Sequence, residues 1–199
     1  MNKTLKYKKV GNSITITKGD THAAGKLVIP DQIDGLPVTE IGENAFDQCK
    51  GLTSVIIPNG VTTIGAMAFY WCSAMQSVAI PSSVTTIGNR AFSYCAGLTS
   101  LVIDKDVNTI GEYAFVYCTG LKSVVINASL KSIGKFAFGY CSNLTRVVIG
   151  SGVKAIADTA FFKCDRLKSV ALPKGASAAI RDAFPKFAGA VVTNTLPKK

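Results

Sequence analysis

The six cysteines of this chain recur at a constant interval of 23 residues. They are Cys49, Cys72, Cys95, Cys118, Cys141 and Cys164, and the chain contains no others. A fixed internal period of about 20–50 residues is typical of solenoids, in which each repeat forms one coil stacked on the next. The spacing therefore predicts a stack of similar coils and leaves the chemistry of the chain open.

Other apolar positions repeat in the same register as the cysteines. An Ala-Phe pair precedes each cysteine by four and three residues, beginning with Ala45-Phe46, and it occurs once more at Ala183-Phe184. An Ile, in most coils followed by Gly, comes four residues before each of the cysteine-linked Ala residues. The whole unit is L-x-x-V-x-I-P-x-x-V-x-x-I-G-x-x-A-F-x-x-C-x-G.

Two periodicities share this unit. Val55 and Ile57 alternate with outward positions, as in a strand with one buried face, whereas Ala45, Phe46 and Cys49 have the three-to-four spacing of a short helix. We therefore predict an α/β solenoid with a parallel sheet on one face and short helical turns on the other. The residue types two positions after the cysteine suit a left-handed helix stop: Gly51, Gly97, Gly120 and Asn143.

The unit resembles the BspA-type, or treponemal-type, leucine-rich repeat, whose pattern is L-x-x-L-x-L-P-x-x-L-x-x-I-G-x-x-A-F-x-x-C. The match runs from about Leu27 to Phe184. The resemblance implies a right-handed leucine-rich-repeat coil in a surface or secreted protein. It also implies an adhesin-like role toward a host or extracellular-matrix protein.

The chain is expected to divide into three parts. Residues 1–26 are predicted to be an N-terminal cap with a hairpin turning at Gly11-Asn12, residues 27–173 the repeats, and residues 174–199 a degenerate C-terminal repeat and tail. No segment has the composition of a transmembrane span or a signal peptide. An extracellular or cell-surface location is therefore implied by the resemblance alone.

The formal charge of +10 is concentrated at the two ends. Residues 1–26 hold six Lys and one Asp, and residues 163–199 hold eight basic and two acidic residues. Like charges at both ends oppose head-to-tail stacking, which favours a monomer; attraction to polyanions or the cell envelope is the alternative. The repeats are nearly neutral, which disfavours nucleic acid as a partner.

The cysteines are expected to be buried free thiols, because each falls on the inward stripe of its coil. A ladder of disulfides between adjacent coils is the alternative. Zinc is disfavoured because the ligand spacing is wrong and His22 is the only histidine. His22 is expected to be a solvated loop residue, and no nucleophile, carboxylate pair or phosphate-binding loop accompanies it. We expect no metal, no cofactor and no enzymatic activity.

Two columns of side chains are candidates for partner binding. The first is an apolar row on the open face of the sheet, beside a serine row that Arg146 interrupts. An exposed apolar strip favours an interaction site, although Val also simply suits strands. The apolar row consists of Ile56, Ala79, Val102, Val125, Val148 and Ala171; the serine row includes Ser54, Ser77, Ser100 and Ser123.

The second candidate column immediately precedes the cysteines and is aromatic: Trp71, Tyr94, Tyr117 and Tyr140, with Tyr70, Tyr113, Phe136 and Phe162 at nearby positions. Such residues anchor many protein interfaces, but stacked rings also stabilise an array of coils. We favour the sheet face. The predicted function is a non-catalytic protein-binding module; the alternatives are a structural spacer of a larger surface protein and polyanion or envelope binding through the basic ends.

Overall fold

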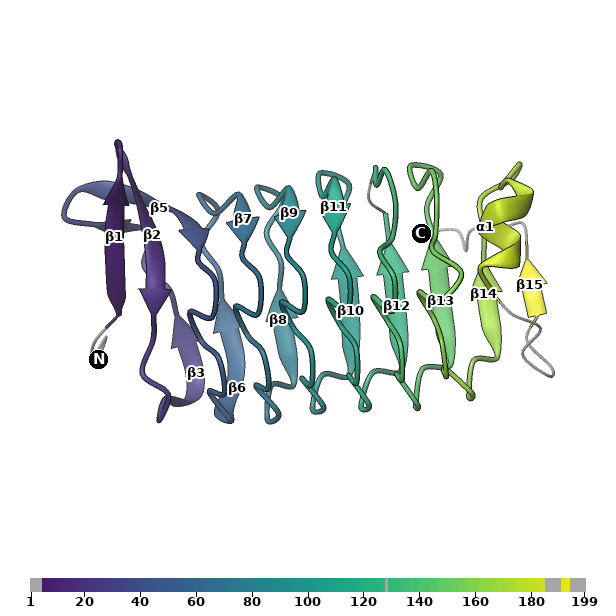
Figure 1. Ribbon diagram of the computed structural model, residues 1–199, viewed down its shortest axis with the longest axis horizontal. Helices are drawn as coiled ribbons and strands as arrows, with labels where there is room; N and C mark the ends of the chain where they lie inside the picture. Colours follow the sequence, from purple (N-terminus) through teal and green to yellow (C-terminus); the bar gives the residue numbers. More distant parts are fainter. Residues whose placement is uncertain (1–4, 128, 185–190, 194–199) are drawn as a thin grey trace.

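The computed structural model describes residues 5–127, 129–184 and 191–193 of the chain. It is a β-solenoid of about seven coils with parallel sheets, and the coils stack along one axis from the N-terminal to the C-terminal end (Figure 1). The predicted solenoid and its parallel sheet are therefore confirmed. Part of the predicted C-terminal repeat and tail, residues 185–190 and 194–199, lies outside the described residues.

The strands of the coils form two faces. One carries β3 (Ala24–Val28), β6 (Gly51–Ile56), β8 (Ser77–Ala79), β10 (Ser100–Ile103), β12 (Ser123–Ile126), β13 (Arg146–Ile149), β14 (Ser169–Ala171) and β15 (Val191–Thr193), in that spatial order (Figure 1). We call this the strand face. The pairs β6–β8, β10–β12, β12–β13 and β13–β14 are in register at the 23-residue repeat; for example, Val102 lies opposite Val125. The offset is 27–28 residues between β3 and β6 and 22 between β14 and β15.

A second sheet begins at the N-terminal end. The hairpin of β1 (Lys6–Val10) and β2 (Ser13–Lys18) is antiparallel, and β2 pairs in parallel with β5 (Leu36–Ile41), beside which lies β4 (Gln32–Ile33). Short parallel strands continue the sheet: β7 (Thr63–Ile64), β9 (Thr86–Ile87) and β11 (Thr109–Ile110). Ile14 and Ile16 of β2 are fully buried, so the hairpin covers the apolar edge of the first coil.

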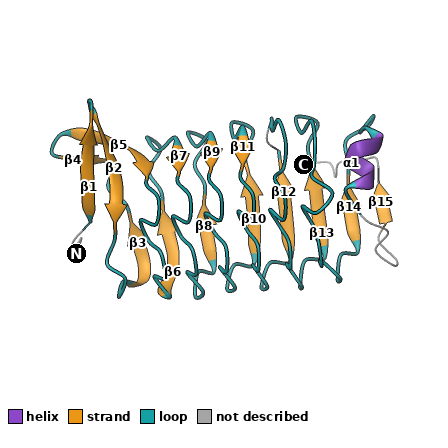
Figure 2. Cartoon of the chain, in the orientation of Figure 1, coloured by secondary structure: helices purple, strands orange, loops and turns teal. Residues whose placement is uncertain are grey.

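The segments that contain the cysteines are turns, so the prediction of short helical turns was wrong (Figure 2). Their backbone N–H groups alternate between two kinds of acceptor. The N–H of Cys72 bonds within its own coil, to the carbonyl of Phe69 at 3.4 Å. The N–H groups of Phe69 and Trp71 instead donate to Ala91 and Ser93 of the next coil, at 2.7 and 2.8 Å. A helix needs every N–H for its own i−4 carbonyl, so this ladder between coils excludes one.

The turn segments that contain the cysteines together form the turn face. In the first five of them two residues have positive φ, five and one positions before the cysteine, as in Met67 at 53° and Trp71 at 57°. In the segment of Cys164 only Lys163 has positive φ, at 58°. A positive φ at the third residue is characteristic of type II turns. The one α-helix among the described residues is α1 (Ala178–Asp182), in the degenerate repeat.

The glycines two positions after the cysteines do not stop a helix, which corrects that prediction. Positive φ among the described glycines occurs at Gly11, Gly25, Gly35 and Gly175 only. Gly97 instead lies directly against the preceding coil: a Cβ on it would sit 3.0 Å from the carbonyl oxygen of Met75. At Gly51, Gly97 and Gly120 the preceding part of the chain therefore lies too close for a side chain without a shift of the backbone.

The interior of the solenoid consists of continuous columns of identical side chains. Phe46, Phe69, Phe92, Phe115, Phe138 and Phe161 stack with ring centroids 5.1–5.2 Å apart and interplanar angles of 2–10°. All six cysteines are buried free thiols, as predicted. The thiol of Cys95 donates a hydrogen bond to the carbonyl oxygen of Phe69 at 3.3 Å, and the other five thiols contact the backbone in the same way.

Burial raises the pKa of these thiols from the ordinary value of 9.0, to about 11 for Cys49 and to about 12 for Cys72 and Cys118. Above pH 9 the unfolded chain therefore loses protons that the folded chain keeps. We predict that this part of the stability is complete below pH 9 and declines between about pH 9 and 12.

The measurement is the urea midpoint at increasing pH, for the native sequence and for Cys95→Ala with Cys118→Ala, in which the decline should be shallower. At pH 8.5 iodoacetamide should modify the thiols of the unfolded chain much faster than those of the folded chain, since the thiolate is the reactive form. Equal rates in the two states would contradict the burial of the thiols.

Candidate interaction surfaces

The apolar row of the strand face is most open over the N-terminal coils. Its side chains are 49% exposed at Val28, 41% at Ile56 and 57% at Val102. Strand pairing places Val28 beside Ile56, and Ile56 beside Ala79, so these side chains form one line across β3, β6 and β8 toward β10. Four coils thus present a continuous apolar strip to solvent.

Over the C-terminal coils the side chains of the same row are largely buried, which corrects part of the predicted site. Val125 on β12 is half-buried, while Val148 on β13 and Ala171 on β14 are each only 5% exposed. Side chains this buried cannot contact a partner without rearrangement. Arg146 is exposed on β13, in register with Ser123 and Ser169, so it interrupts the serine row as expected.

The aromatic column of the turn face is a continuous stack. Trp71 and Tyr94 have ring centroids 5.1 Å apart, Tyr94 and Tyr117 4.8 Å, and Tyr117 and Tyr140 4.5 Å, with interplanar angles of 23°, 11° and 10°. Trp71 is 43% exposed and the three tyrosines are half-buried. Because each ring face is covered by the next ring, the stack offers mainly ring edges and hydroxyl groups to a partner.

Further aromatic residues widen this stack into a layer over the turn face. Tyr70 meets Tyr94 edge-on at 5.6 Å, and Tyr113 stacks on Phe136 at 5.2 Å. Phe162 contacts both columns edge-on, at 5.6 Å from Phe136 and 5.5 Å from Tyr140. We call this set the aromatic layer: Tyr70, Trp71, Tyr94, Tyr113, Tyr117, Phe136, Tyr140 and Phe162.

Small residues and cations complete the aromatic layer. The side chain of Phe136 lies over Gly139, where an added Cβ would approach its ring to 3.2 Å. The ammonium of Lys50 lies 5.5 Å from the centroid of the Trp71 ring, and the guanidinium of Arg90 4.8 Å from that of Tyr113. Cations at these distances are attracted to the ring faces.

Reduced contact with water, together with the neighbouring Tyr140 and Tyr94, raises the pKa of the Tyr117 hydroxyl. The Tyr117 hydroxyl therefore stays protonated at neutral pH and acts as a neutral donor and acceptor. With ring faces occupied by other rings, the geometry favours a stabilising role for the layer over a binding role.

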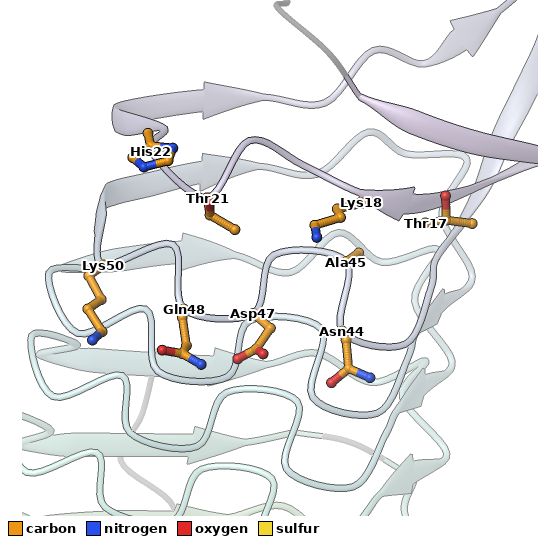
Figure 3. A pocket seen from close by; sticks show the side chains of 9 residues that line it. All are labelled: Thr17, Lys18, Thr21, His22, Asn44, Ala45, Asp47, Gln48 and Lys50. Carbon is orange, nitrogen blue, oxygen red and sulfur yellow. The ribbon is translucent and has the colours of Figure 1, made fainter.

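A pocket of about 540 Å³ lies beside the first coil, where the sequence suggested no site (Figure 3). The end of β2 and the following loop form one wall, with Lys18 and His22, and the turn segment of the first coil forms the other, with Asp47, Gln48 and Lys50. Oδ1 of Asp47 is buried and has no hydrogen-bond partner among the described residues. The signal in the sequence was that Asp47 and Gln48 stand where later coils carry mainly apolar or aromatic residues.

His22 is a solvated loop residue at the rim of this pocket, as predicted. Its side chain is 94% exposed, and its Nδ1 lies 3.5 Å from Asp20. Within residues 5–127, 129–184 and 191–193, no three His, Cys, Asp or Glu side chains gather as metal ligands would. Within the same described residues, no helix is long and apolar enough to cross a membrane.

Comparison with family models gives a match over most of the repeats. The model described as "BspA type Leucine rich repeat region" matches residues 39–168 in six copies. No curated protein sequence matches the chain.

Several solved bacterial structures are similar to the chain. A leucine-rich repeat protein from T. pallidum is 29% identical, with a TM-score of 0.60 over 96% of this chain and 79% of that one. A leucine-rich cell surface protein from Faecalibacterium prausnitzii is 29% identical, with a TM-score of 0.60 over 85% and 55%. The pneumococcal vaccine antigen PcpA, at 15% identity and a TM-score of 0.73 over 96% and 48%, shares the fold. The chain spans about half the length of the last two.

Proposed function

Because the chain belongs to the BspA-type leucine-rich repeat family, we propose that it is a non-catalytic protein-binding module acting at the cell surface or outside the cell. The repeat architecture supports this, since each coil adds surface without adding a catalytic pocket. The similar protein from Faecalibacterium prausnitzii is described as a cell surface protein. An adhesin-like role toward a host or extracellular-matrix protein is part of the proposal.

The observation that carries the proposal is the exposed apolar strip of the strand face. Val28, Ile56 and Val102 are each more than two-fifths exposed, on the parallel strands β3, β6 and β10, and the exposed Ala79 on β8 lies between the last two. Isolated exposed apolar residues are ordinary, but a row of them on a rigid sheet is characteristic of interaction sites. The aromatic layer is the second candidate surface, and its stacked rings stabilise neighbouring coils even without a partner.

Two other functions remain as alternatives with distinct signatures. A structural spacer would need no specific surface, and its full-length gene would add anchor or functional segments. Binding of polyanions or the envelope would use the basic ends, and its affinity would fall steeply with added salt.

We predict that Ile56→Lys with Val102→Lys lowers capture of the cognate matrix protein at least tenfold. An interface that closes over these positions would have to bury two unpaired charges, and about 1.4 kcal/mol already corresponds to tenfold. The measurement is binding of immobilised protein to a panel of purified matrix proteins.

Asn108→Lys with Ser132→Lys is the matched control, because it adds the same charge at exposed positions off the strand face. Tyr94→Ala with Tyr117→Ala tests the aromatic layer. If the strand-face variant binds as well as the native protein, the proposed surface is wrong; if only the tyrosine variant loses binding, the turn face is the site.

A further inference from the structure

We propose that the pocket beside the first coil binds a short acidic peptide in an extended conformation. This site is separate from the strand face. It is formed by the loop after β2 and by the first turn segment, and its lining includes Lys18, Asp47 and Lys50 (Figure 3). Its volume of about 540 Å³ lies in the range of ordinary ligand sites.

The first coil has a backbone carbonyl without a hydrogen-bond donor among the described residues. The equivalent carbonyl in each later coil has one. Two residues before each cysteine, the backbone carbonyl accepts an N–H from the preceding coil: Tyr70 from Gln48 at 2.7 Å, and Ser93 from Trp71 at 2.8 Å. The same bond recurs at Val116, Gly139 and Phe162. The equivalent carbonyl in the first coil belongs to Asp47, and no described residue donates to it.

The loop after β2 replaces only part of the missing preceding coil. Gly19 donates its N–H to the carbonyl of Ala45 at 2.6 Å, which is the rung before Asp47. The chain then turns away, with the N–H of His22 donating to Oδ1 of Asp20 and that of Ala23 to the carbonyl of Asp20. The pocket opens where the loop leaves the ladder, so an added extended segment could supply the next N–H.

The side chain of Asp47 provides a second acceptor in the same place. Its Oδ1 is buried without a partner among the described residues. An unpaired buried oxygen is unfavourable until a donor reaches it. An extended peptide has N–H groups on both sides of its backbone and can serve such acceptors in the manner of an added strand.

The lysines specify the charge of the peptide. Lys18 and Lys50 line the pocket, and neither forms an ion pair within the described residues. Lys50 instead lies over the ring of Trp71. The pocket lining holds the two lysines against the single carboxylate of Asp47, so its net charge attracts anions. In an extended chain, acidic side chains two residues apart point the same way, so both can face the lysines while the backbone faces Asp47.

The test uses the peptide acetyl-Gly-Glu-Gly-Glu-Gly-amide and ¹⁵N spectra of the whole chain. We expect saturable shifts of the Gly19, Gln48 and Lys50 amides with a weak dissociation constant, on the order of millimolar. A peptide with Gln for both Glu should bind at least threefold more weakly. A peptide with sarcosine for each Gly lacks the backbone N–H groups of the glycines. It should also bind at least threefold more weakly.

Protein variants locate the site. Lys18→Gln with Lys50→Gln should weaken binding of the acidic peptide by about three- to tenfold, the range for two exposed ion pairs. Lys105→Gln with Lys131→Gln removes the same charge from exposed positions outside the pocket and should leave binding unchanged. Ile56→Lys with Val102→Lys should also leave it unchanged, so that this site and the strand face are tested separately.

Several outcomes would overturn the proposal: no saturable shifts, equal binding of the Glu and Gln peptides, or equal binding of the sarcosine peptide. Undiminished binding by the Lys18 and Lys50 variant would do the same. Shifts at the same amides that depend on protein concentration without peptide would instead assign the pocket to a second copy of this chain.

Discussion

Phe115→Ala is expected to lower the free energy of unfolding by about 3–5 kcal/mol. Phe115 is fully buried, and its ring stacks at 5.2 Å on Phe92 and again on Phe138. Removing the ring leaves a cavity between two rigid coils whose spacing is fixed by backbone hydrogen bonds, so the site can collapse only slightly. The measurement is urea unfolding followed by circular dichroism, with the slope of the transition compared between variants.

Phe162→Ala is the matched control for this prediction. Phe162 loses the same atoms, but its side chain is 38% exposed and meets its neighbours edge-on. We expect a loss of about 0.5–1.5 kcal/mol, the size of an aromatic contact. Similar losses for both variants would mean that the column of phenylalanines does not hold the coils together.

Gly88→Ala is expected to have the second-largest effect, a destabilisation of about 1–3 kcal/mol. A Cβ on Gly88 would lie 2.6 Å from the backbone nitrogen of Ala66 and 2.7 Å from the carbonyl carbon of Gly65. Both are backbone atoms of the preceding coil, so the new methyl group cannot be accommodated by a side-chain rotation. Two coils must separate, which also weakens the bond from the N–H of Gly88 to Ile64, now 2.8 Å.

The chain itself supplies the control for Gly88→Ala. Ala157 occupies the same column in a later coil, where its N–H still reaches the carbonyl of Ile133 at 3.0 Å. Ala157→Gly should change the stability by less than about 1 kcal/mol, because that coil has already adapted to the methyl group. The check is the urea midpoint of both variants. If Gly88→Ala left the free energy of unfolding unchanged, the coils would not be packed at the distances observed.

Much of the fold was predictable because the repeat is exact in its inward positions. Cys95 and Phe92 recur at 23-residue intervals, and only a stack of equivalent coils buries every copy at once. The strand segments followed from the alternation around Val55, which needs no tertiary information. The thiols could be predicted to be buried for the same reason.

The turn segments could not be predicted from periodicity, because Ala45, Phe46 and Cys49 have the same spacing in a short helix and in two successive turns. The deciding factor was the destination of the backbone N–H groups, which lies in the next coil. The aromatic residues preceding the cysteines adopt positive φ, as at Tyr94 with 61° and Tyr117 with 59°. Side chains rarely favour this region, so their residue types gave no signal.

The candidate surfaces divide in a similar way. The sequence located the apolar row and the aromatic column, but exposure separates Val102 from the buried Val148 within the same row. The pocket beside Asp47 could not be predicted, because its walls come from the cap, at residues 17–22, and from the first coil, at residues 44–50, which share no motif.

The sequence by itself determined that coils of 23 residues stack with identical side chains in line. The reason is that one coil alone cannot bury its apolar side chains, whereas a stack of coils buries them all. Only the tertiary structure decided how the backbone between those positions is bonded, which coils leave their outer side chains exposed, and where the ladder of coils stops. These depend on contacts between coils, and a hydrogen bond or a close approach between coils leaves little trace in the residues of either one.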